Sequence, residues 1–341
     1  MAWAAMKLWR NVLIGGFLLT FVLMLGFFNA AKPRIMVLHS GPQGSAWVEQ
    51  VDEGIRTALE ANRRPLSVEW NYLGFASTAT RGVPEAAAEA RRAIDRFKPD
   101  VLIAVDDEAN SLVAQYYVGR PEPRILYVSI DQPPAAYGYT GASNVSGIAE
   151  QMPWAAIRDA LIRLFPGRAV RLSVVGVDSP TDRAEVAQLT AFDDWGPVAI
   201  GKPTLVSSAG AWRDAVTRAD GDALLVLGPQ DLPGDDGAMV TAAELNRWTQ
   251  DNARPLPIGT QVDFVPDGGA LSFAPAPDDY GRKAVELALD WLDDRATPGP
   301  PPPITSAHFD VAVRQEALAR RGYLLPQIYL EAARQNNSLF P

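Results

Sequence analysis

Residues 34–61 read RIMVLHSGPQGSAWVEQVDEGIRTALEA and contain a strand, a glycine loop and an amphipathic helix in succession. The four consecutive apolar residues at 35–38 favour a parallel strand that is covered on both faces. Gly41 and Gly44 interrupt the chain after this strand, and apolar residues then recur at helical spacing. A loop at the carboxyl end of a parallel strand, next to the free N–H groups of a helix start, can bind a small and preferably anionic ligand.

The same strand–loop–helix unit recurs along the 341-residue chain, which is long enough for two ordinary cores. Strands are expected at residues 35–38, 66–73, 101–105, 125–130, 170–177, 198–206, 223–228, 257–260 and 270–274. Helices alternate with most of these strands, and residues 131–147, rich in Pro, Gly, Ala and Tyr, indicate a crossover between two halves. The sequence therefore predicts an α/β protein with two doubly wound, Rossmann-like lobes and right-handed crossovers.

The composition excludes several classes of function. The chain has 40 acidic and 31 basic residues, and this excess of negative charge argues against a nucleic-acid-binding surface. It has no cysteine, which excludes disulfides, cysteine nucleophiles and thiolate zinc sites. His39 and His308 are the only histidines, so neither a multi-histidine metal site nor most hydrolase triads are expected. We therefore expect no metal and no cofactor.

The amino terminus, residues 1–31, is interpreted as a signal anchor or signal peptide. An uncharged apolar run at 12–28 follows Lys7 and Arg10, as in an export signal. The run is longer than a usual cleavable signal and lacks a good small-residue cleavage site, so a retained hydrophobic helix in the inner membrane is preferred to cleavage and secretion. Both interpretations predict that the rest of the chain is periplasmic.

Five motifs, in this order along the chain, resemble the ABC transporter substrate-binding protein family with a type 1 periplasmic-binding fold. They are VLHSGPQGSAWVEQVDEGI at 37–55, VLIAVDDEA at 101–109, NVSGI at 144–148, GGALSFAPAPDDYGRKAVELALDWL at 268–292 and HFDVAVRQEALARRGYLLP at 308–326. The likeness covers most of residues 34–330 and is greatest to members that accompany sensor kinases. The chain departs from the family at Gln261 and Arg314, where Asp and Asn are usual, and it lacks a lipid-attachment Cys.

The resemblance implies two α/β lobes that are joined by three crossovers and close on a small ligand. It assigns residues 34–131 and 268–296 to lobe 1, and residues 145–262 and 303–341 to lobe 2. The partner that it implies is an ABC permease or a sensor kinase.

Ligands of doubly wound sheets bind beyond the carboxyl ends of the strands, so polar residues at these positions are candidates for the site. In lobe 1 they are Ser40, Ser45, Trp47, Asp106, Asp107, Glu108 and Asp131. In lobe 2 they are Asn144, Asp178, Gln230, Asp231, Gln261 and Asp263. Some have an equally ordinary structural explanation, namely Ser45 as a helix cap, Glu108 as a helix-start charge, and Asp178 and Asp231 as turn residues.

Three adjacent acids at 106–108 repel one another unless solvent, a cation or a cationic ligand group separates them. We expect Asp106 or Asp107 to accept hydrogen bonds from a ligand ammonium or hydroxyl group, while the helix near Ser45 faces an anionic group. The predicted function is a non-enzymatic, envelope-located protein that binds a small polar metabolite, such as an amino acid, for ABC-type uptake or for sensing. Two alternatives stay open: an enzyme of this fold that uses cleft carboxylates, as in glycoside hydrolysis, and a ligand-independent scaffold.

Overall fold

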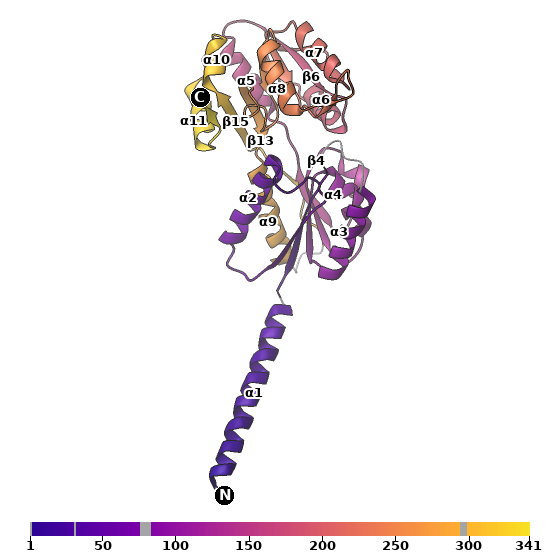
Figure 1. Ribbon diagram of the computed structural model, residues 1–341, viewed down its shortest axis with the longest axis vertical. Coiled ribbons are helices and arrows are strands. Elements are labelled where there is room, and N and C mark those ends of the chain that lie inside the picture. Colours follow the sequence, from indigo (N-terminus) through magenta and orange to yellow (C-terminus); the bar gives the residue numbers. More distant parts are fainter. Residues whose placement is uncertain (1, 31, 76–82, 294–298) are drawn as a thin grey trace.

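The computed structural model describes residues 2–30, 32–75, 83–293 and 299–341. Two lobes lie one above the other along the long axis of the molecule, and helix α1 (Ala2–Ala30) extends from the end of the first lobe that faces away from the second (Figure 1). Each lobe is a mainly parallel sheet with helices on both faces. The predicted α/β class with two doubly wound lobes is confirmed.

The sheet of the first lobe has six parallel strands in the order β14-β5-β4-β3-β1-β2. Its strands are β1 (Arg34–His39), β2 (Ser67–Tyr72), β3 (Val101–Val105), β4 (Arg124–Ile130), β5 (Val145–Ala149) and β14 (Ile304–Thr305). Alternate residues of β1 pack into two separate hydrophobic clusters, one on each face of the sheet. This explains why all four apolar residues at 35–38 are buried.

Helices from both ends of the chain cover this sheet. One face carries α2 (Ala46–Ala61) and α9 (Pro277–Asp293), and the other carries α3 (Val83–Phe97), α4 (Asp107–Leu112), η1 (Ala114–Tyr117) and η2 (Pro134–Tyr137). Helices α2 and α9 touch backbone to backbone, because a Cβ atom at Gly54 would lie 1.8 Å from the Asp278 carbonyl oxygen and one at Gly281 would lie 2.1 Å from the Val51 carbonyl oxygen. A larger residue at either glycine would force the two helices apart.

The sheet of the second lobe runs in the order β16-β15-β13-β12-β9-β6-β7, with β8 also paired to β6. Its strands are β6 (Val170–Val177), β7 (Val198–Ile200), β8 (Thr204–Val206), β9 (Ala223–Val226), β12 (Leu256–Gly259), β13 (Leu271–Pro275), β15 (Phe309–Arg314) and β16 (Leu339–Phe340). Only β13 and β15 are antiparallel to each other in this sheet as the structure describes it. A short hairpin, β10 (Leu232–Pro233) and β11 (Met239–Val240), lies outside it.

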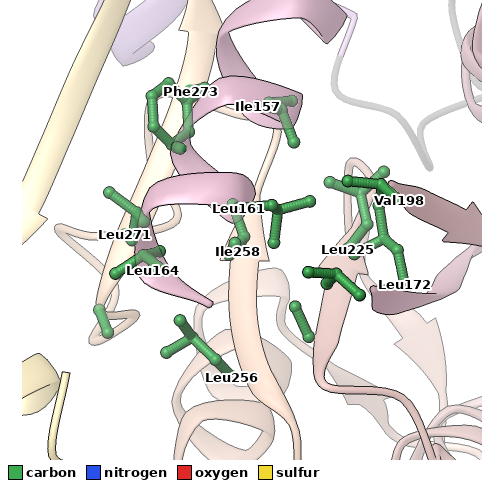
Figure 2. Packing of buried hydrophobic residues seen from close by; sticks show 14 of the residues in the cluster. Ile157, Leu161, Leu164, Leu172, Val198, Leu225, Leu256, Ile258, Leu271 and Phe273 are labelled. Carbon is green, nitrogen blue, oxygen red and sulfur yellow. The ribbon is translucent and has the colours of Figure 1, made fainter. Parts of the chain in front are cut away.

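The helices of the second lobe are α5 (Trp154–Leu164), α6 (Pro180–Ala191), α7 (Ala209–Arg218), α8 (Ala242–Asn252), α10 (Gln315–Arg320) and α11 (Gln327–Gln335). Figure 2 shows α5 lying over the sheet with Ile157 and Leu161 among the core side chains. They belong to the same fully buried cluster as Ile258, Leu271 and Phe273, which come from β12 and β13. Spacing of three to four residues along α5 places its apolar side chains on this one face.

Strand pairing differs from the predicted division of the chain at three strands. β5 and β14, expected in lobe 2, extend the first sheet, and β13, expected in lobe 1, lies in the second sheet between β12 and β15. Residues 131–147 therefore lead back into the same sheet, and the crossover comes after β5. The described chain passes between the lobes after β5, after β13 and after β14, which agrees with the predicted number of three crossovers.

Residues 12–28, the predicted anchor, fall inside α1. Across the part of the chain that the structure describes, no helix combines the length and the apolar character that a membrane crossing requires. The anchor is thus not confirmed and stays a prediction.

Candidate functional site

Three acids follow three neighbouring parallel strands of the first sheet. Asp106 comes directly after β3, Asp131 after β4 and Glu150 after β5, and these strands are adjacent in the order β5-β4-β3. Parallel neighbours lie about 4.8 Å apart and end at the same edge of a sheet. The three residues, called here the acid row, therefore lie at the same edge of the sheet, on strands that together span roughly 10 Å.

The backbone is strained at the acid row. Asp106 has φ 66° and ψ 173°, a combination that costs a residue other than glycine about 1 to 3 kcal/mol. Ser129, near the end of β4, has φ 53°, and its hydroxyl donates a hydrogen bond to Glu150. The backbone of Asp106 is held on both sides, because its N–H donates to the Val128 carbonyl at 3.0 Å and its own carbonyl accepts from the Asn110 side chain at 2.8 Å. The surrounding structure thus fixes a strained backbone where carboxyl groups gather.

Asp107 supports the acid row. Its Oδ1 accepts a hydrogen bond from the Asp131 N–H at 3.2 Å and another from the Tyr137 hydroxyl. Burial, followed by the hydrogen bond to Asp107, raises the pKa of Tyr137, so this phenol stays a proton donor. Glu108 is exposed in the first turn of α4.

The second lobe contributes two buried acids from the first turns of α6, Asp182 and Glu185. Oδ2 of Asp182 accepts a hydrogen bond from the Val177 N–H at 2.5 Å, whereas its Oδ1 is buried and has no hydrogen-bond partner. A Cβ atom at Gly176 would lie 2.5 Å from Oδ2, and one at Gly228 would lie 3.4 Å from Oδ1. The absence of side chains at these two glycines therefore makes room for the Asp182 carboxyl group.

Both carboxyl oxygens of Glu185 are hydrogen-bonded. Thr260 Oγ1 donates to Oε2 at 3.0 Å, and Gln261 Nε2 donates to Oε1 at 2.8 Å. Gln261, predicted as a ligand-binding residue, thus orients a buried acid with its side-chain amide.

The carboxyl groups of both lobes act on one another. Burial raises the pKa of Asp131 to about 6, and burial together with the Asp131 charge raises the pKa values of Glu150 and Asp182 to about 7. The pKa values of Asp106 and Glu185 lie well above the ordinary range, again because of burial first and neighbouring carboxylates second. The charges named among the main causes of these five shifts are all negative. We call Asp106, Asp131, Glu150, Asp182 and Glu185 together the interlobe site.

A hollow of about 210 Å³ opens beside this site in the second lobe. Its polar lining consists of Thr181, Gln230, Asn246, Gln261, Asp263 and Asp267. Burial, and then the charge of Asp267, raises the pKa of Asp263. Asn246 donates to Asp267 at 3.0 Å, while its Oδ1 is buried without a partner. Larger hollows, of about 450 and 490 Å³, lie at the amino ends of the first sheet and beside β8 and α7, and their linings include none of the interlobe acids.

Three candidates from the first unit of the chain have different environments. The Ser40 hydroxyl donates to the Val105 carbonyl at 3.0 Å and accepts from the Ala109 N–H at 2.8 Å, so it ties β1 to β3 and α4. Ser45 is the N-cap residue of α2 but makes no side-chain capping hydrogen bond. The Trp47 ring lies 6.3 Å from the Tyr280 ring, and its indole N–H is buried without a partner. The Glu150 charge is among the groups that raise the pKa of Tyr280, after burial, so this aromatic pair borders the acid row.

Three residues predicted for the lobe 2 side of the site make contacts within the protein. Asn144 precedes β5 and therefore lies at the amino-end edge of the first sheet, where its side chain holds Tyr117, Gly119 and Pro123. Asp178 forms an exposed ion pair with Arg183 at 2.6 Å. Asp231 accepts from the Ala242 N–H at the start of α8 at 2.9 Å. The side-chain contacts of these three residues are structural.

Sequence reasoning missed Glu150, Asp182 and Glu185. Glu150 follows an apolar strand in the same way as Asp131, but the strand was interpreted as part of a crossover. Asp182 and Glu185 are three residues apart and so share one face of α6. This spacing is the sequence signal that could have indicated an acidic helix face.

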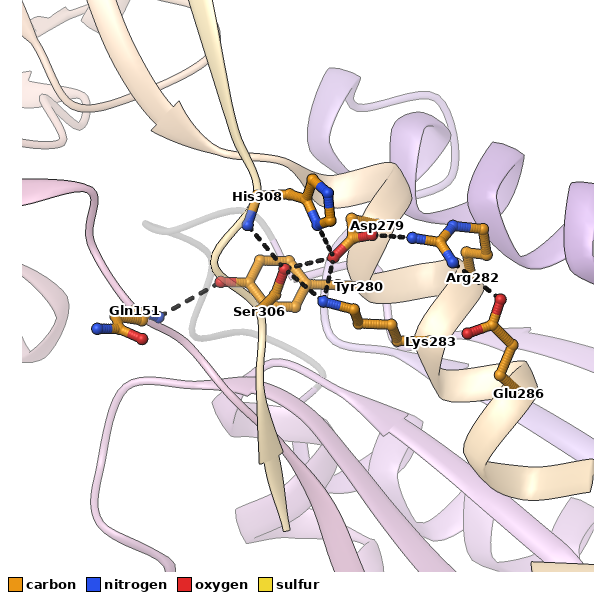
Figure 3. Close-up of polar contacts among 8 residues, drawn as sticks. All are labelled: Gln151, Asp279, Tyr280, Arg282, Lys283, Glu286, Ser306 and His308. Atoms are coloured by element: carbon orange, nitrogen blue, oxygen red, sulfur yellow. Dashed lines mark hydrogen bonds and ion pairs between the residues drawn. The ribbon is translucent and has the colours of Figure 1, made fainter. Parts of the chain in front are cut away.

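The three crossovers between the lobes are joined by a polar cluster that Figure 3 shows. Asp279, at the start of α9, accepts from Ser306 on the third crossover and pairs with Lys283 at 2.7 Å and with His308 Nδ1 at 3.2 Å. Burial acts to raise the pKa of Asp279, but hydrogen bonds from Lys283 and Ser306 outweigh it and lower this pKa. The Gln151 N–H, on the first crossover, donates to the Tyr280 hydroxyl at 3.3 Å.

No protein-family model matches the chain, and no curated protein sequence matches it significantly. Solved structures are similar to it along most of its length. The ABC domain in complex with L-Trp from Streptococcus pneumonia has a TM-score of 0.60 at 14% identity, with coverage of 87% of this chain and 98% of that one. The ligand-free, open structure of a substrate binding protein with adhesive properties from Clostridium difficile has a TM-score of 0.63 at 15% identity, covering 86% and 96%.

An ABC transporter solute binding protein from Agrobacterium vitis with bound D-fucose has a TM-score of 0.53 at 15% identity, covering 83% of this chain and 96% of that one. At these identities the likeness concerns the fold, and it agrees with the two sheets and the crossovers described above. The chain therefore has the two-lobed type 1 fold of periplasmic substrate-binding proteins.

Proposed function

We propose that this protein is a solute-binding protein of the cell envelope that closes on a small polar ligand between its two lobes. The observation that carries the proposal is the interlobe site, in which carboxyl groups of the first lobe raise the pKa values of Asp182 and Glu185 in the second, and a buried oxygen of Asp182 has no partner. Buried polar groups without partners and opposed like charges cost free energy. A ligand between the lobes removes both costs.

In this fold, ligand binding between the lobes is coupled to their closure. A ligand that contacts both lobes favours the closed form by its differential affinity for that form, and the residues between β5 and α5, at Ala276 and between β14 and β15 absorb the rotation. Similar solved proteins are described as bound to L-Trp and to D-fucose, which supports a small-molecule ligand here.

The proposed partner is an ABC permease or a sensor kinase that recognises the closed form. Residues 12–28 are proposed to keep the protein at the inner membrane with both lobes in the periplasm. Cell fractionation with amino-terminal sequencing tests this location. A soluble periplasmic species that starts near residue 31 or 32 would rule out the anchor while leaving the binding function intact.

The alternatives have less support. A two-carboxylate hydrolase needs an acid and a base free to reach the scissile bond, whereas Asp107 is already engaged by Tyr137 and the Asp131 backbone. A ligand-independent scaffold has no use for the unpartnered Asp182 oxygen.

Native mass spectrometry of the full chain, purified from membranes in mild detergent without denaturation, tests the binding function. We expect a retained small molecule, and small-angle scattering should show that adding this molecule back contracts the two lobes. A chain that carries no small molecule and stays open with every solute offered would contradict the proposal.

A further inference from the structure

We propose that the solute is a linear organic diamine or polyamine, whose ammonium groups bridge the acid row of the first lobe and Asp182 in the second. This inference rests on the proposed binding function and names the chemical class of its ligand.

The Asp182 carboxyl group has one oxygen that needs a hydrogen-bond donor. Asp182 is fully buried, its Oδ1 has no donor, and Gly176 and Gly228 place no side chain against its carboxyl group. A buried carboxylate oxygen without a hydrogen-bond donor is unfavourable, and nearly all such atoms in folded proteins have a partner. The partner supplied by a ligand must therefore be an N–H or O–H donor.

The second lobe has another acceptor without a donor. Asn246 is buried at the hollow beside Asp182, and its Oδ1 also has no donor. The acidic side chains of this hollow, Asp263 and Asp267, are acceptors as well when they are ionised. A ligand on this side of the site thus meets these acceptors beside the hydroxyl and amide groups of Thr181, Gln230 and Gln261, and no lysine or arginine is present in the lining of the described hollow.

The opposite wall of the site is acidic. Burial and the charges of neighbouring carboxylates, Asp107 among them, raise the pKa values of Asp106, Asp131 and Glu150, and a neutral sugar would leave the repulsion between these groups in place. An ammonium group supplies both a positive charge and three donors. No group of three or more acidic, histidine or cysteine residues in the described ranges is arranged to hold a metal ion, so the cation inferred is organic.

The number and spread of the carboxyl groups require more than one positive charge. The acid row holds three carboxyl groups on strands that span roughly 10 Å, and Asp182 adds a fourth, so one ammonium group cannot contact them all. Amino groups separated by several methylene groups can do so. The half-buried Trp47 ring packs near Tyr280, which borders the acid row, and offers an apolar face to the methylene chain or a cation–π contact to an ammonium group.

Isothermal titration calorimetry on the full chain in mild detergent tests the inference. The probes are 1,4-diaminobutane and spermidine, with 1,4-butanediol, succinate, L-lysine, L-leucine and D-glucose as comparison solutes. We expect the two amines to bind and the diol, the diacid and the sugar not to. Affinity should increase as the pH rises from 5.5 to 8, because binding displaces protons from Asp131, Glu150 and Asp182.

Two variants make the test specific. Asp182→Asn should weaken amine binding roughly tenfold or more, since it replaces a charge-assisted hydrogen bond. Asp214→Asn, which changes an exposed acid of the same lobe that pairs with Arg218 at 2.9 Å, should leave affinity unchanged. Melting temperatures of both variants show that they are folded.

The outcomes separate the inference from the function on which it rests. Binding of L-lysine or L-leucine without the amines would assign an amino acid, and binding of glucose alone would assign a neutral sugar; either overturns the polyamine inference and keeps the binding function. Amine binding that Asp182→Asn does not weaken would also overturn it. Both the polyamine inference and the binding function would be contradicted only if the purified chain retained no solute and bound none of those offered.

Discussion

The interlobe site and the Asp279 cluster both contain buried acids, yet their pKa values shift in opposite directions. Asp279 is buried to nearly the same degree as Glu185, but Lys283, Ser306 and His308 surround it and its pKa is lowered. The carboxyl groups at the interlobe site have one another as their main charged neighbours, and their pKa values are raised. Burial therefore does not distinguish the two regions. The supply of cations does: the Asp279 cluster contains its own, and we propose that a ligand brings one to the interlobe site.

Substitution of one acid in each region should change stability with opposite sign, and this is the largest effect we expect. Asp279→Asn should lower the free energy of unfolding by roughly 2 to 4 kcal/mol, because it leaves Lys283 and its neighbours without their shared carboxylate. Asp182→Asn should raise it by roughly 1 kcal/mol at pH 8, because it removes a buried charge. Urea denaturation in mild detergent measures both.

The exposed substitution Asp214→Asn serves as the control and should change the unfolding free energy by less than about 1 kcal/mol. Equal destabilisation by Asp279→Asn and Asp182→Asn would show that the two regions are alike, and the contrast drawn between them would be lost.

The pH dependence of stability should also differ between the regions. The folded-state pKa values of Asp131, Glu150 and Asp182 are about 6 to 7, above their ordinary values. Between about pH 4 and pH 7 the folded chain therefore holds more protons than the unfolded chain, and the ligand-free protein loses stability as the pH rises through this window. We expect a loss of roughly 2 kcal/mol, below the sum of three full shifts because the groups share protons.

Thermal melts at a series of pH values measure this slope, and the triple variant Asp131→Asn, Glu150→Gln, Asp182→Asn should flatten it. Asp279 behaves in the opposite way: its lowered pKa gives stability that is present at neutral pH and lost as the pH falls through that pKa. A triple variant with the same slope as the parent would show that these three acids do not govern the pH response.

The smallest effect concerns the strained backbone at the acid row. Asp106→Gly should be more stable than Asp106→Asn by about 1 kcal/mol, because glycine adopts φ 66° and ψ 173° without strain while both variants lose the same carboxyl group. Both should bind the solute more weakly than the parent. Melting temperatures compare the stability of the two variants, and calorimetry compares their affinity for the solute. Equal melting temperatures would mean that the backbone at residue 106 is not strained.

The parts of the site that were predictable from sequence are those that depend on local order. Asp106, Asp107 and Asp131 directly follow apolar strands, and parallel sheets place strand ends together, so their common location follows from the pattern. Asn144 was predicted at the carboxyl end of a strand, but it precedes β5. Because β5 was not recognised as a strand, neither the position of Asn144 nor that of Glu150 at its end could be predicted. Asp182 and Glu185 depend on how the second lobe faces the first, which no local pattern encodes.

The division into lobes shows the same limit. Periodicity identified β13 as a strand, but the sheet that it joins depends on hydrogen bonds with β15, far away in the sequence. β14, which was not predicted, pairs with the equally distant β5. Short strands near the crossovers carry no local mark of their partner sheet.

The glycine contact between α2 and α9 also decides which parts of the molecule can report motion. Since Gly54 and Gly281 leave no gap between the two backbones, α2 must rotate together with α9, whose first residues adjoin the second crossover. A fluorophore attached to the exposed Glu60 on α2 would thus follow the orientation of the whole first lobe. Paired with a second dye at the exposed Asp214, it would convert solute binding into an optical signal.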